Sequence, residues 1–266
     1  MTTLRFLMAM TFFDSKRFFA KITAYFSNLC TNLRVYSQND LRSSVYSFYK
    51  NGYVVIPNYW SAEKCNSLVV ELDQLFNNAS ISNSLRDDIR IYDSQNHSVM
   101  AAEFFSDTQL EQISKWATGL KLENYGSMAN RVAPNKSNFG SGGGWHRDSN
   151  YSQFKTLIYL TDVTEVDDGA FQIIPKTNSA LYVLRSNLRM GKKLTETRWT
   201  NPEIDKLVTG NKICTVTGGA GSLVIFDTSN LHRGAPNKNK SRYALTNYYY
   251  SNLTRQQYGK NTENVN

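Results

Sequence analysis

The chain has 266 residues and a formal net charge of +8. Hydrophobic residues make up 41% of it and charged residues 20%, which excludes an intrinsically disordered chain. The length fits one larger domain with a terminal extension. The three cysteines form no CxxC pair, which disfavours a disulfide framework or a cysteine zinc site and favours a reduced, cytoplasmic setting. The longest apolar stretch, residues 6–13, is too short to span a bilayer, and no secretory cleavage site follows it.

Residues 1–36 form a basic extension. Five Lys and Arg residues oppose one Asp there, so this eighth of the chain carries half of the net charge. Phe12, Phe19, Ile22 and Phe26 recur at helical spacing and predict an amphipathic helix. We expect this helix to pack on the main domain; the alternatives are a helix that contacts a membrane surface weakly and a disordered leader.

The main domain is predicted to cover residues 37–266 and to open with a helix, a strand and a second helix. Asn39 or Asp40 caps the first helix, which ends before Gly52 as its C′ residue. A short strand follows and stops at Pro57. Ser61 then caps a second helix that runs to about residue 76.

Strand patterns dominate after residue 125, separated by Gly-rich turns and without alternating helices. The expected strands are 127–132, 154–160, 170–174, 212–216, 222–226 and 242–250. This pattern predicts a mainly β barrel or double-sheet jelly roll, with the two early helices buttressing one sheet. Residues 179–211 form a polar, basic insertion with no clear strand.

The sequence holds three histidines, and two of them fit a metal site. His146 and Asp148 form an H-x-D element after a glycine run, and side chains at i and i+2 of a strand share one face. His232 is the natural third ligand. Two imidazoles and one carboxylate form the facial triad of non-haem Fe(II) oxygenases, which leaves three coordination positions open. His97 belongs to no motif and is expected at the surface or beside a helix.

Arg242 lies ten residues after His232 and opens a predicted strand. An arginine inside a barrel is costly unless it meets an anion, and its planar fork suits a bidentate carboxylate. The alternative is an arginine held by a salt bridge at the sheet edge.

Taken in order, these motifs resemble the phytanoyl-CoA dioxygenase family over residues 40–252. The motifs are FYKNGYVVIP at 48–57, WHRD at 145–148, LTDV at 160–163, DGAFQIIP at 168–175, GSLVIF at 221–226, HRG at 232–234 and RYA at 242–244. The sequence departs from the family where a usual Pro-Gly-Ser-His is here Pro175-Lys176-Thr177-Asn178, so the histidine of that turn is lost.

The resemblance implies an Fe(II)- and 2-oxoglutarate-dependent oxygenase on a cupin-like double-stranded β-helix. His146, Asp148 and His232 would hold iron, and Arg242 would bind the distal carboxylate of 2-oxoglutarate, with O2 as the second co-substrate. Such an enzyme hydroxylates an aliphatic C–H of a small metabolite and releases succinate and CO2. Related halogenases have a small residue at the carboxylate position, so Asp148 favours hydroxylation.

Other residues are expected around the site. Asn130, Thr156 and Tyr159 lie on strands that should line the co-substrate pocket. The candidate substrate residues are Arg131, Trp145, Arg189, Lys192 and Lys193. Since the insertion together with Lys212, residues 179–212, carries a net charge of +4 from seven cations and three acids, we expect an anionic small-molecule substrate beneath it.

Two other classes of function remain open. One is a non-catalytic jelly-roll protein that keeps a metal for structure. The other is a membrane-surface or nucleic-acid binder driven by the basic charge. No ordered aromatic–basic RNA motif accompanies that charge, so nucleic acid is not an expected partner.

Overall fold

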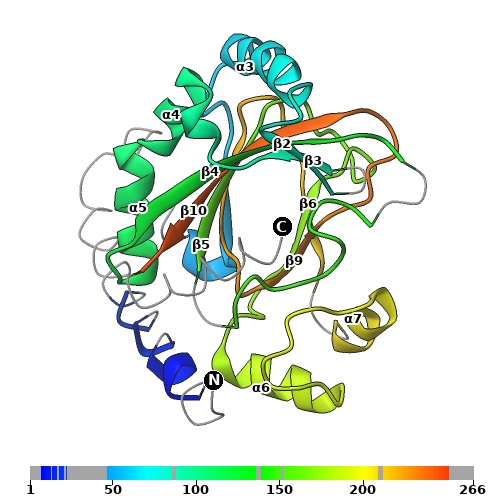
Figure 1. The fold of residues 1–266 in the computed structure, drawn as a ribbon. Helices are drawn as coiled ribbons and strands as arrows, with labels where there is room; N and C mark the ends of the chain where they lie inside the picture. Colours follow the sequence, from blue (N-terminus) through cyan, green and yellow to red (C-terminus); the bar gives the residue numbers. More distant parts are fainter. Residues whose placement is uncertain are drawn as a thin grey trace.

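The computed structural model describes residues 7–12, 14–16, 18–20, 22, 47–85, 88–135, 139–150, 153–208 and 212–251. Two antiparallel sheets dominate it and lie face to face (Figure 1). The seven-stranded sheet has the order β1 (Tyr53–Ile56), β8 (Leu223–Asp227), β5 (Phe154–Tyr159), β10 (Arg242–Tyr250), β4 (Glu123–Val132), β3 (Asp88–Ile91), β2 (Ser82–Leu85). The three-stranded sheet has the order β7 (Cys214–Val216), β6 (Phe171–Ile174), β9 (Leu231–Gly234). The predicted fold class, a mainly β double-stranded β-helix, is confirmed.

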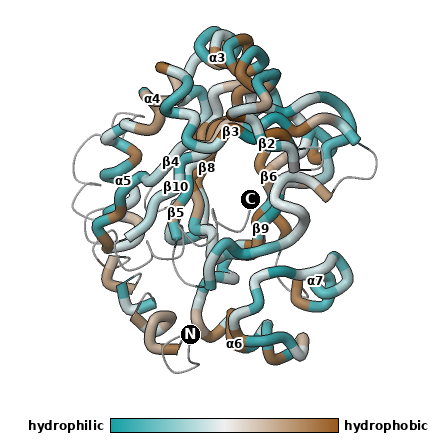
Figure 2. Tube along the Cα trace, viewed as in Figure 1, coloured by the Kyte–Doolittle hydropathy of each residue, from teal (hydrophilic) through white to brown (hydrophobic). Residues whose placement is uncertain are grey.

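Three helices cover the outer face of the larger sheet: α3 (Ala62–Phe76), α4 (Val99–Phe105) and α5 (Thr108–Thr118) (Figure 1). The predicted second helix is α3, and the Ser61 side chain caps it by accepting from the Lys64 N–H. A short 3-10 helix, Ser94–Asn96, precedes α4. Along the helices, hydrophobic positions alternate with hydrophilic ones (Figure 2), as expected of helices with one buried face.

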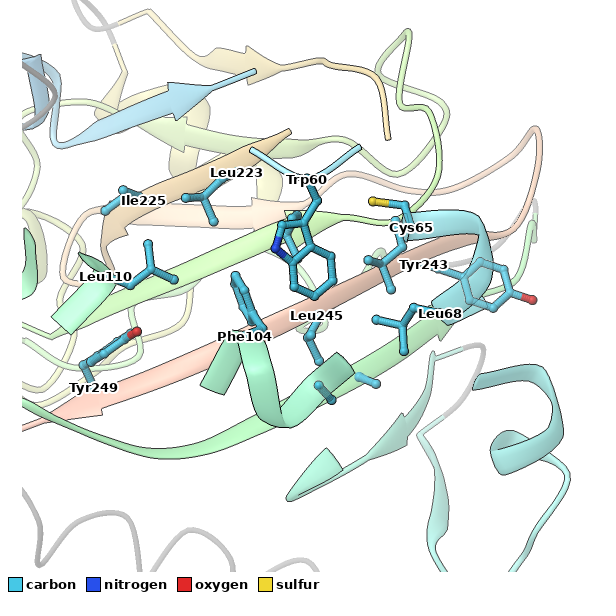
Figure 3. Close-up of a cluster of buried hydrophobic side chains, with 14 of the residues drawn as sticks. Trp60, Cys65, Leu68, Phe104, Leu110, Leu223, Ile225, Tyr243, Leu245 and Tyr249 are labelled. Carbon is cyan, nitrogen blue, oxygen red and sulfur yellow. The ribbon is translucent and has the colours of Figure 1, made fainter. Parts of the chain in front are cut away.

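The main hydrophobic core lies between these helices and the larger sheet (Figure 3). Trp60 and Phe104 meet edge to face at 5.6 Å between ring centroids. From the sheet, β5 contributes Phe154 and Ile158, whose side chains therefore point outward toward the helices.

A second core fills the space between the two sheets. Its members from β5 are Leu157 and Tyr159, which alternate with the outward-facing residues and so point inward. The smaller sheet contributes Phe171 and Ile173 to the same cluster. Successive side chains of β5 therefore point alternately toward the helix layer and toward the space between the sheets.

Several elements differ from the predictions. The hairpin of β2 and β3 and the helices α4 and α5 were not predicted; the strands and α4 are short, although Ser98 caps α4 and Asp107 caps α5. The predicted first helix is described only from residue 47 to 51, and its predicted start lies outside the described residues. Gly52 follows it with φ +77°, as a C′ glycine should.

The insertion is helical: it holds α6 (Ala180–Arg189) and α7 (Asn201–Leu207). It also pairs with the chain next to the predicted metal ligands. The Arg147 N–H donates to Thr197 O at 2.8 Å, and the Trp199 N–H donates to Trp145 O at 3.0 Å. The insertion is therefore part of the wall around that segment.

The described part of the extension is helical and packs on α6 (Figure 1). Met10 is 2% exposed and belongs to a small cluster with Val183. The Asp14 carboxylate accepts from the Ala180 N–H at 2.7 Å, at the start of α6. Phe26 and the proposed boundary at residue 36 lie outside the described residues. Within the described ranges, no helix combines the length and the apolar character needed to cross a bilayer.

Candidate metal centre

The backbone brings the two predicted histidine ligands face to face. The N–H groups of His146 and His232 each donate to the carbonyl of the other at 2.9 Å, and their ring centroids lie 4.4 Å apart. The Asp148 N–H donates to Thr228 O at 3.2 Å, in the turn between β8 and β9. Residues 86 positions apart in the chain are thus held together by main-chain pairing.

The three side chains form a compact donor set. Asp148 Oδ1 lies 3.6 Å from His146 Nε2, and Asp148 Oδ2 lies 3.5 Å from His232 Nε2. One ligand atom from each residue can be chosen so that all three lie within 4.8 Å of one another. Among the described residues, this is the group of His, Cys, Asp and Glu side chains with metal-binding geometry.

The second nitrogen of each imidazole is already engaged. His146 Nδ1 lies 2.8 Å from Gly144 O, and His232 Nδ1 lies 2.9 Å from Asn230 O. Since a carbonyl only accepts, each Nδ1 carries the proton and each Nε2 presents a lone pair toward Asp148. This tautomer, assigned from the hydrogen-bond partners, is the one that a metal ion requires, so the residues fit Fe(II).

The electrostatics of the cluster favour its metal-binding protonation states. Burial raises the pKa of Asp148, but the charge of Lys155 and the neighbouring His146 and His232 outweigh burial and hold that pKa well below its usual value. Burial, followed by the neighbouring His232, lowers the pKa of His146. An ionised carboxylate beside a neutral imidazole is the state that binds a cation.

The glycine run before His146 is required by close packing. Gly142 has φ +84°, and a Cβ there would lie 2.5 Å from His146 Cε1. At Gly140, with φ +78°, a Cβ would lie 2.0 Å from Gly234 O in β9. The loop can therefore pack closely against the segments of His146 and His232 only because Gly140 and Gly142 have no side chain.

Arg242 is 3% exposed and opens β10 on the inner face of the larger sheet. Its Nη1 donates to Gly169 O at 3.1 Å, while its buried Nε has no hydrogen-bond partner among the described residues. Burial lowers the pKa of the guanidinium. A buried donor without an acceptor costs free energy unless a ligand supplies one, which fits the distal carboxylate of 2-oxoglutarate.

Two further predicted pocket residues also lie on the inner face. Tyr159 is opposite Ala244, its hydroxyl donates to Val216 O at 3.0 Å, and it accepts from the Phe171 N–H at 2.8 Å. Asn130 Nδ2 donates to Asp88 Oδ1 at 2.9 Å. Their roles toward a co-substrate remain predictions, since both polar groups already bond to the protein.

Two predicted pocket residues point the wrong way. Thr156 pairs with Ile225 and Asn247 on the face covered by the helices, so it does not line the interior. Arg131 also lies on the outer face, where its guanidinium binds Asp73 of α3 at 3.1 Å and stacks on Phe76. Both expectations are corrected by the strand register.

The remaining predicted substrate residues belong to the insertion or pack against it. Trp145 is 2% exposed within a cluster that includes Trp199, so it fills the core of the insertion and does not face the metal ligands. Lys192 pairs with Glu203 of α7 at 2.9 Å. Arg189 and Lys193 are exposed.

Sequence reasoning missed Lys155, whose side chain enters the interior beside the ligands. Its Nζ lies 2.9 Å from Asp148 Oδ2 and 4.2 Å from the centre of the Tyr248 ring. The alternation of β5 could have indicated it, because Lys155 shares a face with Tyr159 and Thr156 does not. His97, by contrast, is exposed at the end of the 3-10 helix, as predicted.

The facing sheets and the two-histidine, one-carboxylate cluster define a double-stranded β-helix enzyme of the dioxygenase type. The family model described as phytanoyl-CoA dioxygenase matches residues 48–244. The chain therefore belongs to the phytanoyl-CoA dioxygenase family, whose enzymes use Fe(II) and 2-oxoglutarate. The predicted family and enzyme class are confirmed.

Solved structures agree with the fold. HygX from Streptomyces hygroscopicus, with nickel and 2-oxoglutarate bound, has 15% identity and a TM-score of 0.60 over 82% of this chain and 89% of that chain. The epimerase SnoN from nogalamycin biosynthesis, in complex with Fe3+, alpha ketoglutarate and nogalamycin RO, has 16% identity and a TM-score of 0.59 over 79% and 83%. EctD from S. alaskensis, with bound Fe, has 17% identity and a TM-score of 0.58 over 82% and 79%. No curated protein matches the chain.

Proposed function

We propose that this enzyme hydroxylates an aliphatic C–H bond of a small molecule and converts 2-oxoglutarate to succinate and CO2. The observation that carries the proposal is the cluster of His146, Asp148 and His232, with both Nε2 lone pairs directed at the carboxylate. The carboxylate occupies the position that a halogenase would leave open, which favours hydroxylation.

The residues of the chain have separate tasks in this reaction. His146, Asp148 and His232 would hold the iron, and Arg242 would orient 2-oxoglutarate by its distal carboxylate. When bound, iron would activate O2, which is the oxidant for the C–H bond, with 2-oxoglutarate as the two-electron co-reductant. The apolar side chains between the sheets, Phe171 and Phe226 beside His232, exclude water from this space.

We propose further that the substrate is anionic and that exposed cations of the insertion help to hold it. Support comes from the net charge of the insertion and from its main-chain pairing with residues 145–147. Lys192 is compensated by Glu203, which leaves Arg189 and Lys193 as the stronger candidates. Replacing Arg189, Lys192 and Lys193 together by Gln should weaken substrate binding and its salt dependence, and a neutral substrate would contradict the idea.

A cytoplasmic setting is part of the proposal. Cys65 and Cys214 are free thiols in the described part of the chain, which suits a reducing compartment. The small-molecule partner follows from the class of enzyme.

The decisive experiment supplies the enzyme with Fe(II), 2-oxoglutarate and 18O2 in the presence of metabolite pools. We expect succinate formation and a product that gains one 18O atom. Asp148→Ala should abolish both, while His97→Ala, which removes an exposed histidine, should match the wild type. Succinate formation with a product that gains no oxygen would contradict hydroxylation and indicate another outcome.

The alternative of a non-catalytic metal-binding protein makes a different prediction. A structural metal site has no need for a buried arginine whose Nε lacks an acceptor. Anaerobic addition of 2-oxoglutarate to the Fe(II) protein should produce a weak visible charge-transfer band. Absence of that band in a protein that binds Fe(II) would favour the non-catalytic alternative.

A further inference from the structure

Lys155 is an inward-facing lysine in the middle of the larger sheet. It pairs with Phe226 on β8 and with Tyr248 on β10, and it is 9% exposed. A buried ammonium is costly unless it is paired. Two contacts compensate it: Asp148 Oδ2 at 2.9 Å and the face of the Tyr248 ring at 4.2 Å. The contact with the Tyr248 ring therefore helps to keep the ammonium of Lys155 next to the carboxylate of Asp148.

The contacts of Asp148 divide its two oxygens. Oδ1 lies 3.6 Å from His146 Nε2. Oδ2 lies 3.5 Å from His232 Nε2 and forms an ion pair with the ammonium of Lys155 at 2.9 Å. A metal ion bound by both imidazoles would compete with the Lys155 ammonium for Oδ2. Among the described contacts, no ammonium lies next to Oδ1, so the metal would bind that oxygen without competition.

The number of oxygens that Asp148 gives to the metal decides how many positions stay open. A carboxylate can bind through one or both oxygens. With one oxygen, the facial triad leaves three positions, which suffice for the chelating end of 2-oxoglutarate and for O2. With both oxygens, one of these positions is lost.

We propose that Lys155 is a positioning residue that keeps Oδ2 of Asp148 out of the metal coordination and so preserves the position that the co-substrates need. The inference rests on the proposed function, since it concerns the same iron site. Lys155 acts through Asp148 and the metal, and it is not itself a catalytic residue.

A second lysine offers a matched control. Lys64 pairs with Glu103 at 2.6 Å and lies 4.0 Å from the centre of the Trp60 ring, so it repeats the ion pair and aromatic contact of Lys155 on α3. Its replacement removes the same kind of contacts outside the metal cluster.

The experiment compares the full-length wild type with Lys155→Met, Lys155→Arg and Lys64→Met, using Co(II) as the probe metal. Three quantities are measured: the affinity for Co(II), the d–d absorption spectrum of the Co(II) protein, and its affinity for 2-oxoglutarate. Wild type that fails to bind Co(II) would contradict the proposed function itself, before the role of Lys155 arises.

In Lys155→Met we expect Co(II) affinity to stay the same or rise, because a neighbouring like charge is gone. The d–d spectrum should change before 2-oxoglutarate is added, as the second oxygen enters the coordination. The affinity for 2-oxoglutarate should fall by about tenfold or more, in line with changes of about 10–100-fold for groups behind metal ligands. Lys155→Arg, which keeps the cationic donor, and Lys64→Met should both retain the wild-type spectrum and affinity.

Three results would overturn the proposal. An unchanged Co(II) spectrum together with weaker 2-oxoglutarate binding would mean that Lys155 contacts the co-substrate directly. Loss of Co(II) binding in Lys155→Met, or unchanged affinity for 2-oxoglutarate, would mean that the lysine does not hold an oxygen of Asp148 away from the metal. Circular dichroism of each variant checks that the fold is retained.

Discussion

Arg242 is a buried residue whose hydrogen bonding is incomplete within the described part of the chain. Its side chain is 3% exposed, one nitrogen bonds to Gly169 O, and Nε lacks a partner in the described residues. Desolvation of a guanidinium without a carboxylate partner is unfavourable, so an anionic ligand should bind there strongly.

Replacing Arg242 by Ala should therefore weaken 2-oxoglutarate binding by about 10–100-fold, since a charge-assisted contact contributes about 1.5–3 kcal/mol. Titration calorimetry with the Co(II) protein measures this change. Arg131→Ala serves as the control, because that arginine binds Asp73 on the outer face. Equal affinities in wild type and Arg242→Ala would exclude the assignment of the distal carboxylate.

Asp168, which lies next to the residue that binds Arg242, makes the stability of the fold depend on pH. It is 2% exposed and precedes Gly169, whose carbonyl holds Arg242. Burial raises the pKa of Asp168, but hydrogen bonds from Asn239 and from Thr164 outweigh burial and lower the pKa to about 2. Because the folded-state pKa lies below the unfolded value of about 3.9, this carboxylate stabilises the fold above that value. The contribution is lost as pH falls toward 2.

Asp168→Asn should lower the free energy of unfolding at neutral pH by about 1–3 kcal/mol, because charged hydrogen bonds are lost. The difference from wild type should shrink between about pH 4 and about pH 2, where the wild-type carboxylate becomes protonated. Urea unfolding at several pH values measures both. A difference that is the same at every pH would contradict the assignment.

At the scale of elements, the turn after β6 carries backbone strain. Lys176 has φ +63° in the left-handed region, at the position where the resembled family has glycine. The same turn is tied to the β8–β9 turn, since Asn178 Nδ2 donates to Asp227 Oδ2 at 3.0 Å and the Thr177 N–H donates to Asn230 Oδ1 at 3.1 Å. The lost family histidine is thus replaced by an amide that joins two turns.

Lys176→Gly should raise the free energy of unfolding by about 0.5–1 kcal/mol. The left-handed conformation costs a side chain about 1–2 kcal/mol, and the greater freedom of glycine in the unfolded chain offsets part of this gain. Thermal unfolding measures it. Asp93→Gly, at φ +52°, is the control and should gain less, because Asp tolerates this region. A less stable Lys176→Gly protein would contradict the argument.

The extension shows both a buried and an exposed apolar side. Met10 packs on Val183, whereas Met8 is 63% exposed and Phe18 is 60% exposed. Residues 1–36 contain five cations and one acid, and a basic, partly apolar segment of this composition favours an anionic membrane. Membrane-surface contact is therefore the proposal for this element, while catalysis is assigned to the rest of the chain.

Deleting residues 1–36 should leave Co(II) and 2-oxoglutarate affinities unchanged. It should abolish sedimentation with vesicles that contain phosphatidylglycerol, and phosphatidylcholine vesicles should not bind either protein. Met8→Ser combined with Phe18→Ser should have the same effect on vesicle binding. A folded truncation without Co(II) affinity would refute the separation, and vesicle binding that survives the deletion would refute the membrane contact.

At the scale of the whole molecule, the metal ligands join parts that the chain keeps far apart. His146 and Asp148 follow the glycine loop, and His232 lies on β9 of the smaller sheet. A bound ion would cross-link these segments in the folded state alone. Binding that is restricted to the native state stabilises it in proportion to the logarithm of ligand concentration.

Co(II) at about 100 times its dissociation constant should therefore raise the free energy of unfolding by about 2.7 kcal/mol. Differential scanning calorimetry should show a melting temperature higher by several degrees, and a further rise with 2-oxoglutarate. Asp148→Ala should show neither shift, whereas His97→Ala should show both. A shift that persists in Asp148→Ala would locate the ion elsewhere.

The sequence by itself predicted most of the strands, the helix capped by Ser61, and the three candidate metal ligands, but not the hairpin of β2 and β3 or the strand β9 that carries His232. The strands and the helix are encoded locally, in alternation and capping. It did not determine which face of a strand looks inward. Thr156 and Arg131 were expected in the pocket, and both lie under the helices because the register with β8, β10 and β3 assigns their faces.

Only the tertiary structure decided that Lys155, and not Thr156, meets Asp148. A strand buried on both faces carries polar residues on either side, and period-two alternation separates two sets without saying which set is inside. That choice depends on where the second sheet and the helix layer pack. The physical reason is that side-chain direction is a local property of the strand, whereas the position of a face relative to the interior exists only after the layers assemble.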